Sequence, residues 1–184
     1  MSLDIHVSMN EQALAPFRSA WASAAEQASA IPVNDLLAAA REHSRAVDRQ
    51  QLPRFLHPHL DSFDEVIQML EHPQWGADQA TQQALRAALG YFVDDDDLIP
   101  DQNAQFGLLD DAIVLELALA EHQHEWQSWR EYRRFLADYP QFGELDRQGW
   151  MALREQELQL ALRHRRRLRQ GYARSPELET FRVN

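Results

Sequence analysis

The middle of the chain reads Tyr91-Phe-Val-Asp-Asp-Asp-Asp-Leu-Ile-Pro-Asp101 and then Gly107-Leu-Leu-Asp-Asp-Ala-Ile-Val114. Before the first segment, apolar residues stand at helical spacing at Leu85, Leu89 and Phe92, and an apolar run continues the second segment. These flanks predict two helices joined by an acidic loop. Because the second helix is apolar nearly all round at its start, we expect it at the centre of a helical bundle.

The rest of the chain carries the apolar spacing of amphipathic helices. Apolar residues recur at steps of three and four, and Pro or Gly interrupts the pattern between segments. This predicts helices over about residues 14–31, 34–47, 62–72, 78–93, 108–136 and 146–170, with a loop over 52–60. We expect residues 1–184 to form one all-α domain, a single-domain helical bundle of about six helices around the central helix hairpin of residues 85–125. Residues 171–184 lack a clear pattern and are expected to be an arm, disordered or frayed.

Local capping signals mark the starts of three of these helices. Asn34 offers a side-chain acceptor to the second helix, and Ser62 with Glu65 three residues later forms a capping box for the third. Asp110 and Asp111 should lie in the first turn of the helix that follows the acidic loop. A carboxylate is favourable there because it meets free backbone amides and the positive end of the helix dipole.

The composition excludes several classes of protein. The chain has 184 residues and no cysteine, which rules out disulfides, thiolate metal sites and thiol nucleophiles. Its most apolar stretch, residues 112–120, is shorter than a bilayer requires and contains Glu116. The N-terminal sequence lacks the basic and apolar regions of a signal peptide. We therefore expect a cytoplasmic protein that does not enter membranes.

Charge is distributed unevenly along the chain. The net charge is -11, and no basic residue lies between Arg86 and Arg130, where ten acidic residues fall. Such an acidic chain is not expected to bind nucleic acid as its main partner. In contrast, an arginine cluster occupies the last predicted helix, at Arg163, Arg165, Arg166, Arg167 and Arg169. Three interpretations stay open for it: dipole complementation with internal ion pairs, a protein partner, and nucleic acid.

The hairpin resembles the YkvA-like family, the bacterial domain of unknown function 1232. In that family an aspartate precedes Leu-Ile-Pro-Asp, and a glycine stands three residues before an Asp-Asp pair that opens an apolar helix. The residues at these positions here are Asp97, Pro100, Asp101, Gly107, Asp110 and Asp111. The resemblance covers about residues 85–125, implies a helix hairpin and carries no activity to transfer. Here three aspartates at 94–96 replace the Ser-Pro-apolar run usual in the family, and Gln-Asn-Ala-Gln at 102–105 occupies a loop that is normally apolar, so membrane association is not expected.

The aspartates of this motif allow three interpretations. They are Asp97, Asp101, Asp110 and Asp111. We favour caps and turn-forming residues that hold the two helices together. The second interpretation is a metal site for Ca²⁺ or Mg²⁺, although the spacing is not that of an EF-hand. The third is general acid and base chemistry by a carboxylate pair.

A single Glu-x-x-His pair follows on the same predicted helix. Glu121 and His124 would share one face, the arrangement that di-iron bundles use twice. Because a second copy is absent, we expect both side chains to be solvated. We expect His122 to be a hydrogen-bonded histidine at the edge of the core.

These observations favour a non-enzymatic interaction or assembly module. A protein partner or a second copy of the chain is the candidate partner. No nucleophile elbow, phosphate-binding glycine loop or dinucleotide motif supports the common enzyme classes. The alternative is a divalent-cation-dependent protein, with a hydrolase as one form of it, that uses the hairpin carboxylates. Whether the protein is an enzyme stays open, and catalysis is the less favoured interpretation.

Overall fold

The computed structural model describes residues 10–94, 98–99 and 107–172, with side chains described up to residue 165 of the last helix. These residues form seven α-helices and two short 3-10 helices, and no strand occurs among them. The α-helices are α1 (Glu11–Ala30), α2 (Val33–Ala46), α3 (His57–Glu71), α4 (Gln79–Phe92), α5 (Leu109–Glu121), α6 (Gln123–Asp138) and α7 (Arg147–Tyr172). The 3-10 helices are η1 (Arg54–Leu56) and η2 (Pro140–Phe142). The prediction of an all-α bundle is confirmed.

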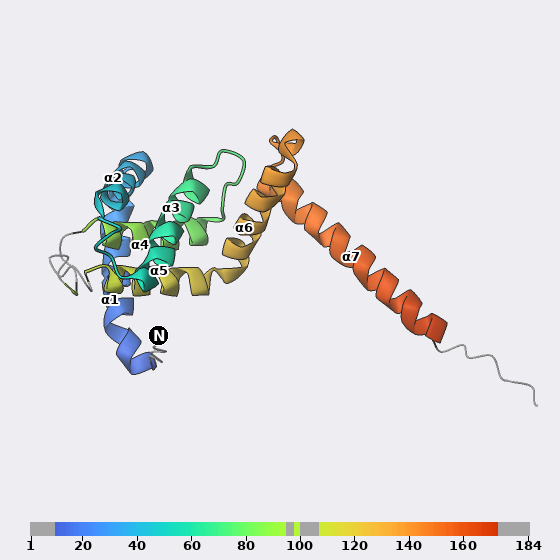
Figure 1. Cartoon of the computed structure of the whole chain (residues 1–184), viewed down its shortest axis with the longest axis horizontal. Coiled ribbons are helices and arrows are strands. Elements are labelled where there is room, and N and C mark those ends of the chain that lie inside the picture. Colours follow the sequence, from blue (N-terminus) through green and yellow to red (C-terminus); the bar gives the residue numbers. More distant parts are fainter. Residues whose placement is uncertain (1–9, 95–97, 100–106, 173–184) are drawn as a thin grey trace, which may run out of the picture.

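Helix α4 is central, and α1 and α5 pack against it (Figure 1). Helices α1 and α4 approach closely because Gly90 has no side chain: a Cβ atom built there would lie 2.9 Å from the Cβ of Ala28. Beside this contact, the Arg86 guanidinium donates to the carbonyls of Ala28 and Ile31 at 3.0 and 2.9 Å. These carbonyls belong to the C-terminal end of α1, where the last carbonyls lack the usual helical partners; the Ala28 carbonyl also accepts from the Ile31 amide at 3.3 Å.

The predicted single helix over 108–136 is wrong, because the chain breaks at His122 between α5 and α6. The backbone of His122 leaves the helical region, with φ -112° and ψ 28°. Its ring Nδ1 lies 3.0 Å from the hydroxyl oxygen of Thr81 on α4, so a side-chain contact holds the break in place. The break redirects the chain, so α6 runs in a different direction from α5 (Figure 1).

Two predicted helix starts are also wrong. Helix α3 begins at His57, inside the predicted loop, because Pro58 fits a first helical turn that needs no amide hydrogen there. Ser62 therefore lies within α3, and its hydroxyl donates to the carbonyl of Pro58 at 3.0 Å instead of capping the helix. Helix α2 begins one residue before Asn34, with Pro32 at the cap position and no side-chain cap.

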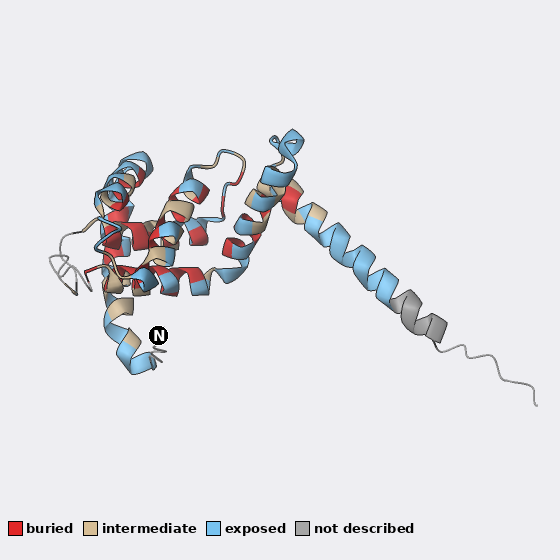
Figure 2. Ribbon diagram, in the orientation of Figure 1, coloured by how far each residue is buried: buried red, intermediate tan, exposed pale blue. Residues whose placement is uncertain are grey.

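Aromatic residues fill the contact between the segment joining α3 to α4 and helices α6 and α7. The Trp75 ring lies 5.3 Å from Trp129 and 4.9 Å from Tyr132, and Trp150 of α7 lies 5.9 Å from Tyr132. Beyond Trp150, α7 extends away from the bundle (Figure 1), and its described surface is exposed almost throughout (Figure 2). Within the described ranges, no helix combines the length and the apolar character needed to span a bilayer.

Candidate functional sites

A buried polar contact joins the two helices of the hairpin. Asp110 and Asp111 lie in the first turn of α5, as predicted, and they are only 0% and 2% exposed. The Tyr91 hydroxyl, near the end of α4, donates to Asp110 Oδ2 at 2.8 Å. The same oxygen accepts from the Ile99 amide at 2.9 Å, while the Leu98 amide donates to the Tyr91 hydroxyl at 3.0 Å. Tyr91 and Asp110 therefore tie α4, α5 and part of the loop together.

Burial raises the pKa of the Tyr91 phenol far above its ordinary value of 10.0, and the neighbouring Asp110 carboxylate adds to this rise. The hydrogen bond from the Leu98 amide opposes it, but burial dominates. The phenol is therefore protonated at neutral pH and serves as a hydrogen-bond donor. A phenol in this state does not act as a general base.

The described part of the hairpin does not by itself form a metal centre. Asp110 Oδ1 is buried and has no hydrogen-bond partner among the described residues. However, no three acidic, histidine or cysteine side chains within these residues come together as metal ligands. Gly107 is buried in the turn before α5, whereas Asp97, Pro100 and Asp101 lie outside the described residues. The cation and acid–base interpretations therefore stay predictions.

The predicted Glu-x-x-His pair does not form on one helix, because Glu121 ends α5 and His124 belongs to α6. Both side chains are exposed, as predicted, and Glu121 accepts a hydrogen bond from Arg18 of α1 at 2.6 Å. His122 is half-buried and in contact with Thr81, which confirms its expected place at the edge of the core. These residues border a polar hollow of about 320 Å³ that also includes Asp78 and Arg147.

A largely buried ion pair fixes the start of α7 against α6. The Arg147 guanidinium donates to both carboxylate oxygens of Glu125, at 2.6 and 2.7 Å. This hydrogen bonding with Glu125 raises the pKa of Arg147 above its ordinary value despite partial burial. This contact could not be predicted from the sequence because the two partners lie on different helices. The only signal in the sequence is a glutamate, Glu125, directly beside Trp126 of an aromatic stripe; the structure shows that this glutamate is buried.

Past this anchor, α7 exposes several large apolar side chains. Leu158, Leu160 and Leu162 are 58%, 63% and 40% exposed. Leu158 and Leu162 follow the half-buried Met151 at helical spacing, so these three share one face of α7. We call Met151, Leu158 and Leu162 the α7 stripe. Leu160 lies on a different face.

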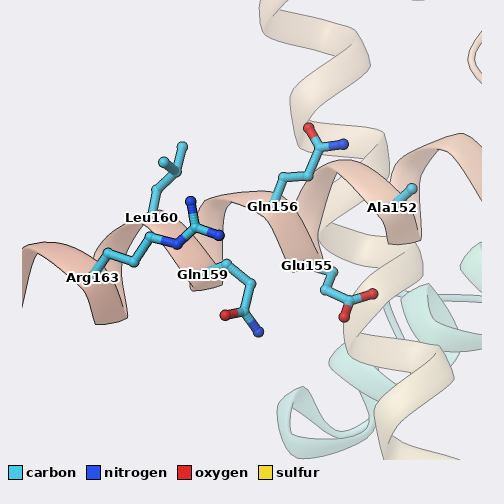
Figure 3. Close-up of a pocket in the computed structure, with 6 residues that line it drawn as sticks. All are labelled: Ala152, Glu155, Gln156, Gln159, Leu160 and Arg163. Atoms are coloured by element: carbon cyan, nitrogen blue, oxygen red, sulfur yellow. The ribbon is translucent and has the colours of Figure 1, made fainter.

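Another face of this part of α7 is open to solvent. A surface hollow of about 420 Å³ lies there, and its lining residues all come from α7 (Figure 3). They are Ala152, Glu155, Gln156, Gln159, Leu160 and Arg163. Because no other element contributes to the hollow, it is a face of one helix and not an enclosed ligand site.

The arginine cluster lies in the last turns of α7, as predicted. Arg163 and Arg165 are exposed and form no ion pair with any residue that the structure describes. Arg154, nearer the bundle, does form an ion pair, with Glu131 of α6. Arg166, Arg167 and Arg169 belong to α7, but their side chains lie outside the described set.

No family model, curated protein or solved structure matches this chain. Its function must therefore be argued from its own geometry. Asp110 and Asp111 are buried, and Asp110 accepts hydrogen bonds from the Tyr91 hydroxyl and the Ile99 amide, which suits a structural role. The exposed half of α7 combines apolar side chains with charges that have no described partner, which suits contact with another macromolecule.

Proposed function

We propose that this protein is a non-enzymatic interaction or assembly module. In this proposal, the bundle of α1 to α6 holds α7 away from its own core so that the α7 stripe can bind a protein partner. The partner offers either an amphipathic helix that packs against α7 or an apolar groove that receives α7. Membranes and nucleic acid are not expected partners, and we place the interaction in the cytoplasm.

The exposure of the α7 stripe is the observation that supports this proposal. Leu158 and Leu162 are 58% and 40% exposed. Burying either side chain against a partner would be favourable, because it removes apolar surface from water. They continue a face that starts with the half-buried Met151, so one partner helix could extend contacts that begin at the bundle. The anchor of α7 through Arg147 and Trp150 keeps this face in a defined direction.

The length of the exposed segment supports the same proposal. In proteins, most helix stability comes from packing an apolar face, and short helices without such packing are marginal in water. The part of α7 beyond Leu153 has no such packing among the described residues. A partner that covers the stripe would supply the missing contacts and favour the helical state.

Photo-crosslinking in the cells that produce the protein tests the proposal. A benzophenone amino acid replaces Leu162, on the α7 stripe, and in a matched control it replaces Leu160, on another face. We expect a specific protein adduct at position 162 and none, or much less, at position 160. Mass spectrometry then identifies the attached chain. Absence of an adduct at position 162, or equal adducts at both positions, contradicts the proposal.

A divalent-cation-dependent function, with a hydrolase as one form of it, is the second candidate. The favouring observation is the pair of buried carboxylates at Asp110 and Asp111, together with Asp110 Oδ1, which has no hydrogen-bond partner in the described part of the chain. A cation could satisfy such an oxygen, and Ca²⁺ and Mg²⁺ both prefer oxygen ligands. In this alternative the remaining ligands come from Asp97 and Asp101.

A further inference from the structure

The charges along the α7 stripe point to a particular partner. Glu155 and Arg165 stand on the same face as the stripe: the order Met151, Glu155, Leu158, Leu162, Arg165 advances by alternating steps of four and three residues. This alternation is the spacing of the contact positions in a pair of coiled helices. Both charged side chains are exposed, and neither forms an ion pair with a described residue.

We infer that the α7 stripe binds the same stripe of a second copy of the chain, with the two helices antiparallel. This inference rests on the proposed function, and it names the partner. When residue 160 of one copy is level with residue 160 of the other, Leu158 lies beside Leu162 of the second copy. Glu155 then lies beside Arg165 of the second copy. The twofold symmetry produces each contact twice.

The charge pattern selects this orientation over the parallel one. A parallel pair would place Glu155 beside Glu155 and Arg165 beside Arg165, and like charges in contact repel. It would also place the two bundles side by side, at the same end of the helix pair, although each chain carries a net charge of -11. The antiparallel pair replaces these repulsions with two attractions and places the bundles at opposite ends of the paired helices.

Other residues around the stripe are compatible with a helix pair. Ala161 flanks the stripe at the centre of the proposed pair, and its small side chain allows two helices to approach. Arg154, which would flank the stripe near the bundle, is already paired with Glu131 of its own chain. Arg163 and Leu160 point away from the stripe and serve as internal controls.

Sedimentation equilibrium of the purified full-length chain tests the inference. We expect the wild type to form dimers as its concentration rises. Glu155→Arg and Arg165→Glu each replace two attractions with two repulsions, so each should weaken dimerisation by about tenfold. The double variant restores opposite charges in the antiparallel pair, and its dissociation constant should return towards that of the wild type.

Matched variants on other faces of α7 complete the experiment. Leu158→Gln should weaken the dimer, whereas Leu160→Gln, an equally exposed leucine off the stripe, should leave it unchanged. Arg163→Glu should likewise leave it unchanged and provides the control for Arg165→Glu. Because all these side chains are exposed in the single chain, circular dichroism should show folded protein in every case.

The outcomes separate this inference from the proposed function. A chain that stays monomeric at all concentrations, or a dimer that the double charge reversal fails to restore, overturns the inference. If a different protein is then crosslinked at position 162, the proposed function stands while the second copy is excluded as the partner. If position 162 crosslinks to the chain itself and the charge reversals behave as expected, both are supported.

Discussion

Tyr91 joins three parts of the hairpin through one hydroxyl group, which donates to Asp110 and accepts from the Leu98 amide. Tyr91→Phe keeps the buried ring but removes both contacts. We expect it to lower the free energy of unfolding by about 1–3 kcal/mol, because buried polar groups lose a partner. Urea unfolding measures this change. Tyr139→Phe, at a tyrosine 49% exposed, is the control and should change little; equal effects of the two variants would contradict the structural role of Tyr91.

Asp110 separates the structural and cation interpretations of the hairpin. If it mainly holds the hairpin together, Asp110→Asn should lower the melting temperature in the presence of chelator, and added Ca²⁺ or Mg²⁺ should not stabilise the wild type. A bound cation would instead raise the wild-type melting temperature by mass action, and the variant would lose that gain. Thermal melts with chelator and with each ion distinguish the two. An ion-dependent gain confined to the wild type would favour the cation-dependent alternative.

His72 predicts a dependence of stability on pH. Partial burial, together with the nearby Arg133 charge, lowers its pKa below the ordinary 6.5 in the folded chain. As the pH falls below about 6.5, the unfolded chain binds a proton that folded His72 does not, so stability decreases. This loss continues down to the folded-state pKa. The contribution of His72 to the free energy of unfolding is thus fully present only above the pKa that this histidine has in the unfolded chain.

His72→Phe should remove this part of the pH dependence. The phenylalanine ring can keep the edge contacts with Trp129 and Tyr132, at 5.3 and 5.5 Å between ring centres in the wild type. Between pH of about 7.5 and 5.5, the wild type should lose more stability than the variant. Urea unfolding at several pH values measures the difference. The exposed His124 offers the control His124→Phe, which should follow the wild-type curve.

At the scale of the elements, the packing of α1 on α4 depends on Gly90. In an open helix, Gly→Ala increases stability by about 1 kcal/mol. Gly90→Ala should do the opposite and cost about 1–3 kcal/mol, because the new methyl group would lie 2.9 Å from Ala28 Cβ. Chemical unfolding gives the sign directly. Ala28→Gly in the same chain should recover part of the loss, since it removes the opposing methyl group.

Gly149 provides the matched comparison within a helix. A Cβ atom at Gly149 would meet the end of the Leu145 side chain at 2.8 Å, and a side-chain end can rotate away. Gly149→Ala should therefore cost less than Gly90→Ala. If both substitutions stabilised the protein, the close contact between α1 and α4 would not be the reason that residue 90 is glycine.

The sequence predicted the presence of the helices better than the residues at which they begin and end. Apolar spacing alone indicated the hairpin and the bundle, because helix periodicity reflects burial of one face. It did not reveal the break at His122, which depends on a contact with Thr81 in another helix. The capping-box pattern was also misleading: it predicted that Ser62 caps a helix, but Ser and Glu three residues apart occur inside helices as well.

The candidate sites were also predictable only in part: the sequence placed residues along the helices but not their contacts between helices. The positions of Asp110 and Asp111 in a first helical turn followed from local sequence. Their Tyr91 contact and the Glu125–Arg147 ion pair did not, because each joins helices that only the tertiary fold brings together. The exposure of the α7 stripe could not be foreseen either. An apolar stripe looks the same in sequence whether its own chain or another one covers it.

At the scale of the whole molecule, the chain divides its buried surface unequally. Helices α1 to α6 and the first two turns of α7 share one core, which extends to Trp150 and the partly buried Leu153. The following residues of α7, up to 165, are exposed. Folding of the bundle should therefore depend little on the outer part of α7, whereas association should depend on it.

Ending the chain after Arg154 tests this division. The shortened chain keeps Arg147 and Trp150 and loses the exposed leucines and the arginine cluster. At protein concentrations low enough to keep both chains monomeric, its free energy of unfolding should stay within about 0.5 kcal/mol of the full-length value. Trp150→Ala in the full chain removes a side chain only 5% exposed, and it should cost about 3–5 kcal/mol.

Concentration then links stability to assembly. If a second copy covers the α7 stripe, the full-length chain should become more stable as its concentration rises, because dimerisation favours the folded state by mass action. The shortened chain lacks Leu158 and Leu162, so its melting temperature should not change with concentration. Thermal melts of both chains over a concentration series measure this contrast. A shortened chain that is already destabilised when dilute would instead show that the outer part of α7 belongs to the folding unit.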